Sequence, residues 1–226
     1  MTPSDATPRR GFLARLAVIT AAFGFGALRP RPALASQRAE LDRWIDALTG
    51  KHRCLFDFPQ HADGLPLIHI YNYLNTYKTA YGESGESVNA VGTLYGAGPG
   101  ASIPLGWNDA IWEKYRIGEV MKLVDPRTRL PAVRNMFFKP RDGDPVLHNG
   151  SVTVAGMENL LRMGGSFLMC NNSLLNWAGF LAGREGRPSS VEREIRANLL
   201  HGVTVVPAMV IAIEKAQGAG IAYNRQ

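Results

Sequence analysis

The chain of 226 residues has a formal net charge of +6, but five of its arginines and one aspartate lie in the first 35 residues. The other 191 residues hold 20 basic and 18 acidic side chains and no run of Lys and Arg with interleaved aromatics, which argues against nucleic-acid binding. This part is long enough for one domain with a full core, and its two cysteines are too few for a disulfide scaffold.

The first 35 residues have the pattern of a twin-arginine signal peptide. Arg9 and Arg10 precede an apolar stretch over 16–28, and residues 33–35 (Ala-Leu-Ala) are small at both positions that a signal peptidase reads. The apolar stretch has 13 residues, fewer than the roughly 20 that span a bilayer. We therefore expect cleavage before Ser36, export of the folded protein by the twin-arginine machinery, and a periplasmic location without a stable membrane anchor. The alternative is an uncleaved anchor.

Helical and strand patterns alternate along residues 36–226, after a short helix over 39–48. Asn108 or Asp109 is a candidate cap for one helix, and Ser189 with Glu192 has capping-box spacing for another. Predicted strands lie at 52–58, 88–95, 166–170, 203–206 and 221–223, and helices at 65–81, 108–123, 152–163, 173–181, from 189 onward and 208–217. Strands separated by helices need crossover connections, so we expect an α/β fold: a single domain with a mostly parallel five-stranded sheet and helices on both faces.

Residues 124–150 interrupt this alternation. Three prolines (Pro126, Pro131 and Pro140) and the run Asp-Gly-Asp-Pro at 142–145 predict an irregular segment of about 25 residues, which is long for a passive connection. We interpret it as a peripheral insert that acts as a lid, an oligomer contact or a flexible addition. On this interpretation, deleting 126–145 leaves a folded core.

Cys170 is the main candidate for a reactive residue. It ends the apolar run 166–170 and is followed by Asn171, Asn172 and Ser173 at the start of a predicted helix. A thiol there lies at the carboxyl end of a strand, where open α/β sheets bind ligands. It also lies at a helix amino end, whose free N–H groups stabilise a thiolate. The alternative is a small buried residue that ends a core strand.

Carboxyl ends of parallel strands share one edge of a sheet, so the segments after the predicted strands, 57–61, 95–100, 170–173 and 207–208, should converge. The three polar residues after Cys170 either hydrogen-bond a substrate or cap the helix. His61 is a candidate base or partner of Cys170, or else a solvated loop residue. Cys54 lies in mid-strand, and its offset from Cys170 should exceed the roughly 7 Å limit for a disulfide, so we expect a core residue.

Cofactor motifs are absent from the sequence. The glycine-rich loop 96–100 follows a strand, as phosphate loops do, but it lacks the Gly-Lys-Ser/Thr ending and the G-x-G-x-x-G pattern, so we interpret it as a tight turn. The five histidines have no metal-ligand spacing. We expect neither a metal nor another cofactor.

The run Phe-Leu-Met-Cys-Asn-Asn-Ser-Leu at 167–174 resembles the cysteine segment of the DsrE/DsrF-like family. The run 202–208 and the tail 216–223, with Gln217, Gly220 and Tyr223, extend the resemblance, which covers the chain from residue 55 to the C-terminus. It implies a five-stranded α/β fold that assembles into trimers or hexamers. In the sulfur-relay members, the cysteine that matches Cys170 carries a persulfide and passes sulfur to a partner.

One position departs from the family pattern. Many exported members have a histidine before a glycine at the end of the second strand, where this chain has Tyr95 before Gly96. Tyr95 and Gly96 remain candidates for substrate binding, but a proton-transfer role there does not carry over.

Two functions follow from these observations. The first is a periplasmic sulfur carrier or sulfurtransferase-like protein that accepts sulfane sulfur on Cys170 and exchanges it with a donor or acceptor protein. The second is a non-catalytic module of the same fold that binds a small ligand or serves in assembly. Reactivity of Cys170 separates the two.

Overall fold

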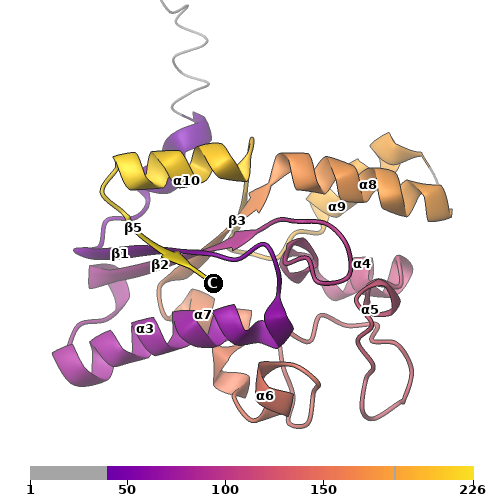
Figure 1. Ribbon diagram of the computed structural model, residues 1–226, viewed down its shortest axis with the longest axis horizontal. Coiled ribbons are helices and arrows are strands. Elements are labelled where there is room, and N and C mark those ends of the chain that lie inside the picture. The colour runs from indigo at the N-terminus through magenta and orange to yellow at the C-terminus, as the bar shows by residue number, and fades with distance from the viewer. Residues whose placement is uncertain (1–39, 186) are drawn as a thin grey trace, which may run out of the picture. The chain divides into compact units, whose positions relative to one another are not determined.

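A parallel five-stranded sheet organises the structure, a computed structural model that describes residues 40–226 except Gly186 (Figure 1). The predicted signal peptide and its cleavage site lie outside the described residues. The strand order is β4-β3-β2-β1-β5, and all four neighbouring pairs are parallel. The strands are β1 (His52–Asp57), β2 (Val88–Leu94), β3 (Gly165–Cys170), β4 (Val203–Val206) and β5 (Ala222–Arg225). The predicted α/β class and parallel sheet are confirmed.

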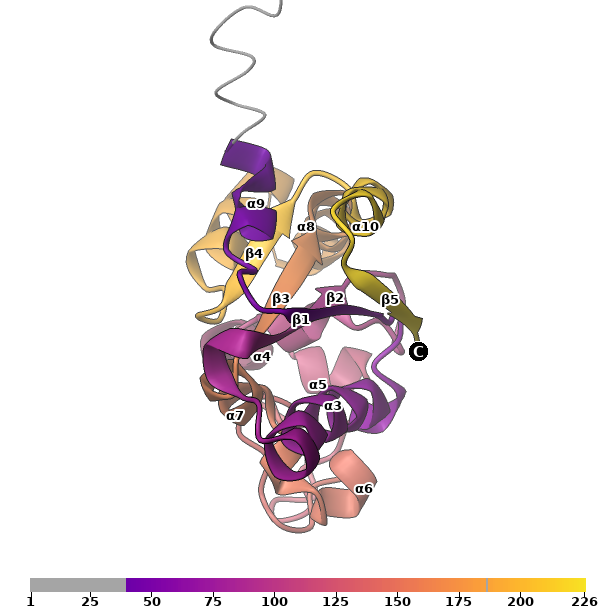
Figure 2. The ribbon, with the colours of Figure 1, turned by 90° about the vertical axis from the view of Figure 1, so that its left-hand side faces the viewer.

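Helices cover both faces of this sheet, as Figure 2 shows. One face carries α3 (Leu65–Tyr81) and α7 (Met157–Arg162), and the other carries α10 (Met209–Gly218) with α8 (Asn171–Glu185) and α9 (Pro188–Ala197) beside it. The shorter elements are a helix over 40–46, α4 (Asp109–Lys114), α5 (Ile117–Val120), α6 (Leu147–Gly150) and four 3-10 turns, Ala62–Gly64, Gly85–Ser87, Ile103–Gly106 and Thr153–Ala155. In the described part of the chain, no helix is long and apolar enough to cross a membrane.

Strand alternation divides the apolar interior into two clusters. In β3, Phe167 and Met169 belong to the larger cluster, which includes α3 residues, while Leu168 and Cys170 belong to a smaller one with Met209 of α10. Successive side chains of a strand point to opposite faces of the sheet, which explains the division. We call the second group the α10-side cluster. Cys170 therefore faces α10.

Helix α3 matches its predicted bounds because the signals at both ends are local. Pro66 occupies the first turn, where its missing N–H costs nothing, and Gly82 ends the helix in a left-handed conformation with φ of 68°. Between them, Leu67, Ile70 and Leu74 are buried at helical spacing. One face of the helix therefore packs against the sheet.

The predicted helix over 108–123 is broken in the structure. Asn108 does cap its start, accepting a hydrogen bond from the Ile111 N–H at 3.3 Å. Arg116 adopts a positive φ of 53°, which separates α4 from α5. A Cβ added to Gly118 would lie 2.2 Å from the Ala132 carbonyl oxygen, so the chain packs too closely here for a larger residue. The predicted capping box is also wrong, because α9 begins at Pro188 and Ser189 lies inside the helix.

The segment 124–150 is irregular, as predicted, but it is not peripheral. Met136 and Phe137 are fully buried in the larger cluster. Asn135 donates from Nδ2 to the carbonyl oxygens of Leu105 and Trp107, each at 2.8 Å. Buried hydrogen bonds and apolar side chains replace regular secondary structure in anchoring this segment. The interpretation of the segment as peripheral is therefore wrong, while the folding of a core without 126–145 stays a prediction.

Candidate functional site

Cys170 ends β3 and directly precedes α8, as the sequence predicted. Its side chain is 5% exposed, belongs to the α10-side cluster and forms no disulfide. Across the sheet it pairs with Val206, and α10 begins three residues later at Met209. The first turns of α8 and α10 therefore both begin next to Cys170. Free N–H groups at helix amino ends favour negative charge nearby.

Cys54 lies on the other face of the sheet. Its strand partner is Ala90, which in turn pairs with Gly165, five residues before Cys170. Strand rise and spacing then separate the two Cα atoms by roughly 19 Å, far beyond disulfide reach. Burial raises the pKa of the Cys54 thiol to about 11. The prediction of a core residue is confirmed.

Tyr95 directly follows β2 and is the neighbour of Cys170 at the end of the next strand. The last paired residues of β2 and β3 are Leu94 and Met169, so Tyr95 and Cys170 occupy the next position on adjacent strands and point to the same face. The Tyr95 side chain packs against the α10-side cluster, and its hydroxyl donates to Asp57 Oδ1 at 2.8 Å. The aromatic ring thus connects the thiol region with a carboxylate at the end of β1.

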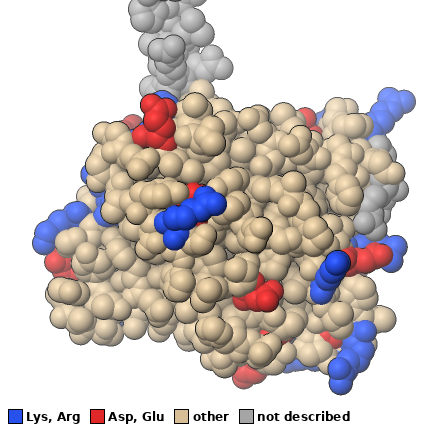
Figure 3. Space-filling model, in the orientation of Figure 1, with Lys and Arg blue, Asp and Glu red and all other residues tan. Residues whose placement is uncertain are grey.

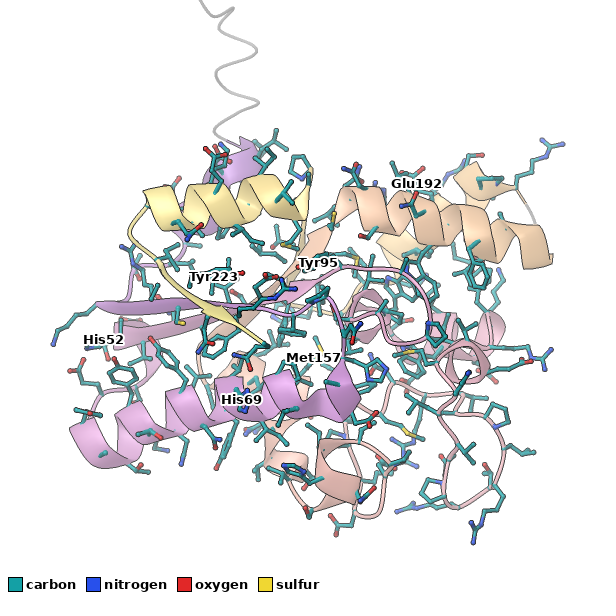
Figure 4. All side chains as sticks on the ribbon, in the orientation of Figure 1. His52, His69, Tyr95, Met157, Glu192 and Tyr223 are labelled. Carbon is teal, nitrogen blue, oxygen red and sulfur yellow. The ribbon has the colours of Figure 1, made fainter. Side chains whose placement is uncertain are left out.

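Asp57 is the centre of a polar cluster that spans β2, β1 and β5. Its carboxylate is buried, at 1% exposed, and accepts from the Tyr223 hydroxyl at 2.7 Å and from Arg225 Nη1 at 2.6 Å. The Thr93 hydroxyl donates to it at 3.2 Å. Figure 4 shows Tyr95 and Tyr223 on the same side of the sheet. We call Asp57, Thr93, Tyr95, Tyr223 and Arg225 the Asp57 cluster.

The Asp57 cluster fixes the protonation of its members. Burial alone would raise the pKa of Asp57, but the hydrogen bonds from Tyr223, Tyr95 and Arg225, with the charge of Arg225, lower it below its usual value. Burial and the bond to Asp57 raise the pKa of Tyr95 to about 12. The bond to Asp57 also raises the pKa of Tyr223. At neutral pH the cluster is a carboxylate surrounded by protonated donors.

His61 is buried rather than solvated, and its ring hydrogen-bonds to Asp63 and Pro99 rather than to Cys170. It is 7% exposed, its Nδ1 accepts from the Asp63 N–H at 3.1 Å, and its Nε2 lies 3.2 Å from the Pro99 carbonyl oxygen. Since Nδ1 accepts, Nε2 carries the proton and donates to Pro99. Burial lowers the pKa of His61 despite this bond and the nearby Asp63. The imidazole links the loop after β1 to the loop after β2.

Gly96 and the residues after Cys170 mainly hold the loops in place. The Gly96 N–H donates to Ser173 Oγ at 3.2 Å, and its carbonyl accepts from Trp177 Nε1 at 3.1 Å. The φ of Gly96 is 96°, and a Cβ there would lie 2.5 Å from the Pro59 carbonyl oxygen. These bonds occupy both backbone groups of Gly96 and fasten its loop to α8.

The two asparagines differ in what they contact. Asn171 accepts from an Arg196 guanidinium N–H, which connects α8 to α9, while Asn172 is exposed at the first turn. Of the polar residues predicted after Cys170, Asn171 and Ser173 thus bind other elements. Asn172 is the one whose side chain faces solvent beside the thiol.

Sequence reasoning missed most of the Asp57 cluster. Asp57 and Tyr95 fell in segments predicted to converge, but the link through Arg225 was invisible because the last strand was predicted to end at Tyr223. The structure extends β5 to Arg225 and pairs that residue with Asp57 in register. The sequence does contain one signal for this link. Arg225 stands two positions after Tyr223, so in a strand both side chains lie on the same face of the sheet.

No family model matches the chain, and no curated protein matches it. Among solved structures, the chain is similar to a protein of unknown function, MTH1491 from Methanobacterium thermoautotrophicum, with 18% sequence identity and a TM-score of 0.39. The match covers 77% of this chain and 99% of the other. A likeness this distant carries no argument, so the interpretation rests on the residues of the site.

The chemistry open to this site is that of a thiol and of hydrogen-bonded oxygens. Within residues 40–226, Gly186 aside, no group of three or more His, Cys, Asp or Glu side chains could hold a metal ion. The Asp57 carboxylate has its acceptor sites occupied by neighbouring donors. Cys170 is the thiol at the carboxyl edge of the sheet in the described part of the chain.

Proposed function

We propose that the protein is a periplasmic sulfur carrier that holds sulfane sulfur on Cys170. The position of this thiol carries the proposal: it is free, it ends a central strand, and the first turns of two helices begin beside it. The resemblance of 167–174 to the DsrE/DsrF-like cysteine segment supports the same chemistry. The proposal also includes export through a twin-arginine signal, assembly into a homo-oligomer, and exchange of sulfur with a donor or acceptor protein.

The transfer step is a thiolate exchange. The Cys170 thiolate attacks the outer sulfur of a donor persulfide, R–S–SH. A new S–S bond forms at Cys170 while the donor S–S bond breaks, and the donor leaves as the thiolate RS⁻ with the electron pair of that bond. The products are Cys–S–SH and RS⁻, so atoms and charge balance. Delivery to an acceptor thiolate is the same reaction in reverse.

Mass spectrometry of the intact protein tests this function. After exposure to glutathione persulfide and removal of excess reagent, the protein should gain about 32 Da for one sulfur atom. The variant Cys54→Ala should gain the same mass, and Cys170→Ser should gain none. Circular dichroism confirms that both variants fold. A wild-type protein that never gains sulfur, and whose Cys170 resists alkylation at neutral pH, contradicts the proposal.

The burial of Cys170 favours a second candidate, a non-catalytic module in which this thiol is only a core residue. A side chain that is 5% exposed needs a local opening before a partner protein can reach its sulfur. The alkylation rate of Cys170 decides between the two functions, since a core thiol reacts only when the whole protein unfolds. A rate that does not follow global unfolding favours the carrier.

A further inference from the structure

We infer that a second site, separate from Cys170, binds an uncharged aromatic small molecule in a pocket beside α8. The pocket has a volume of about 450 Å³ and is lined by residues 97–99, Val120 of α5, and Asn176, Trp177 and Phe180 of α8. Figure 1 shows α8 and α5 at the same end of the sheet. Pockets of about 300–1,000 Å³ with mainly apolar walls hold small organic ligands.

The walls of this pocket are preorganised. Trp177 is 3% exposed, packs edge-on against Trp107 at 5.5 Å between ring centroids, and donates its indole N–H to Gly96. The loop over 97–100 is fixed as well, because the Pro99 carbonyl accepts from the His61 ring and the Gly100 carbonyl accepts from the backbone N–H of His61 at 2.8 Å. A ligand therefore meets a formed cavity and pays little to order it.

The lining excludes charged ligands. No Lys, Arg, Asp, Glu or His is among the lining residues, and the indole N–H of Trp177 is already bonded outside the pocket. An ion placed here would lose hydration without gaining a counter-ion. Much of the molecular face in Figure 3 is likewise uncharged, with Lys, Arg, Asp and Glu scattered over it. A neutral molecule fits the chemistry of this pocket.

Aromatic side chains at the pocket favour an aromatic ligand. Phe180 is 51% exposed although its ring packs edge-on against Trp177, at 5.7 Å between centroids and an interplanar angle of 84°. A ligand ring placed against the exposed part of Phe180 would cover it and add edge-to-face or stacked contacts. The exposed Asn176 amide offers an NH2 group as donor and a carbonyl oxygen as acceptor. The structure thus points to a ring system that carries one hydroxyl or carbonyl group.

Calorimetric titration with matched probes tests the inference on the full chain. We expect 2-naphthol to bind saturably with a Kd on the order of 100 µM. Its charged analogue 2-naphthalenesulfonate should bind at least about tenfold more weakly because no counter-ion lines the pocket. The aliphatic alcohol 1-decanol should also bind more weakly, since it makes no ring contacts. The variant Cys170→Ser should bind 2-naphthol as the wild type does.

Variants locate the binding. Phe180→Ala should weaken 2-naphthol binding by about tenfold, and Ala97→Trp should block it by filling the pocket. Leu175→Ala is the matched control, because Leu175 is 43% exposed on the same helix but does not line the pocket. If Ala97→Trp fails to fold by circular dichroism, Phe180→Ala decides alone.

Several outcomes overturn the inference. These are the absence of saturable binding, equal binding of naphthol and the sulfonate, equal binding of decanol, or affinity that Phe180→Ala leaves unchanged. A change of oligomeric state in Phe180→Ala together with no probe binding would show that a second copy of the chain covers the pocket, which also overturns it.

Discussion

Replacing Asp57 with asparagine should loosen the C-terminal strand. All four residues of β5 are exposed, and the strand pairs only with β1 among the described elements. Asp57 holds it through the Tyr223 hydroxyl and the Arg225 guanidinium. The substitution keeps the shape of the side chain but removes the negative charge. It therefore tests whether the charge, rather than the packing, keeps β5 in the sheet.

The expected cost follows from the hydrogen bonds. Apart from the longer bond from Thr93, three donors, from Tyr95, Tyr223 and Arg225, bond the carboxylate, and each of these three bonds loses about 1 kcal/mol when the acceptor becomes neutral. Asparagine does not carry the desolvation cost of a buried charge at this position, which is 1% exposed, and this offsets part of the lost stability. Arg225 keeps half of its side chain in water, so no buried charge is left unpaired. The net loss in the free energy of unfolding should be about 2 kcal/mol.

Urea unfolding at several pH values provides the assay. The pKa of Asp57 is lowered in the folded protein, so its contribution is complete above the unfolded-state pKa of about 3.9 and is lost as the pH falls through the folded-state value. The difference between wild type and Asp57→Asn should therefore be full at pH 7 and shrink in acid. Asp63→Asn, at a side chain 73% exposed, is the matched control and should change stability little. An equal loss at pH 7 and at acid pH, or no loss at all, refutes the reasoning.

Two further predictions concern His61 and the segment 124–150. The pKa of His61 is lowered by burial, so its neutral form stabilises the fold fully above the unfolded-state pKa of about 6.5, and this stability falls as the pH drops below that value. Thermal unfolding should show a smaller fall in Tm between pH 7.5 and 5 for His61→Gln than for wild type; parallel curves would contradict this. Phe137→Ala should cost about 3–5 kcal/mol in urea unfolding, because the ring is fully buried, whereas a loss below about 1 kcal/mol would restore the view of a peripheral insert.

The positions of the strands along the chain and their parallel direction could be predicted from the sequence, because strand and helix signals are local. The apolar run 166–170 and the glycines before it define β3, and Pro66 with Gly82 bounds α3. The ends of elements were harder where tertiary contacts decide them. Arg116 takes a positive φ, a conformation that an arginine does not itself predict, so the sequence indicated one helix where the structure has α4 and α5. Packing against Ala132, sixteen residues away from Arg116, constrains that region.

The site was predictable only where one residue acts alone. Cys170 stands at a strand end and before a helix, which are features of its immediate neighbours in the chain. The Asp57 cluster depends instead on the register of β5 against β1, which brings Arg225 to Asp57 across 168 residues. Likewise, His61 looked solvated because its loop is polar, although Pro99 and Phe137 bury it. Contacts between distant segments leave little trace in one sequence.

The position of Tyr95 bears on the proposed sulfur exchange at Cys170. Its pKa is raised to about 12 and its proton is engaged by Asp57, so the hydroxyl is a poor base at neutral pH. Exchange of sulfur between thiolates needs no base in the transfer step, because the attacking group is already a thiolate and the donor leaves as a thiolate. A tyrosine at the position where many exported members of the DsrE/DsrF-like family have histidine therefore agrees with the proposed sulfur exchange at Cys170 better than with a reaction that moves a proton there. If Tyr95→Phe leaves persulfide loading of Cys170 unchanged, the hydroxyl serves the Asp57 cluster alone; a large loss of loading would assign Tyr95 to the transfer itself.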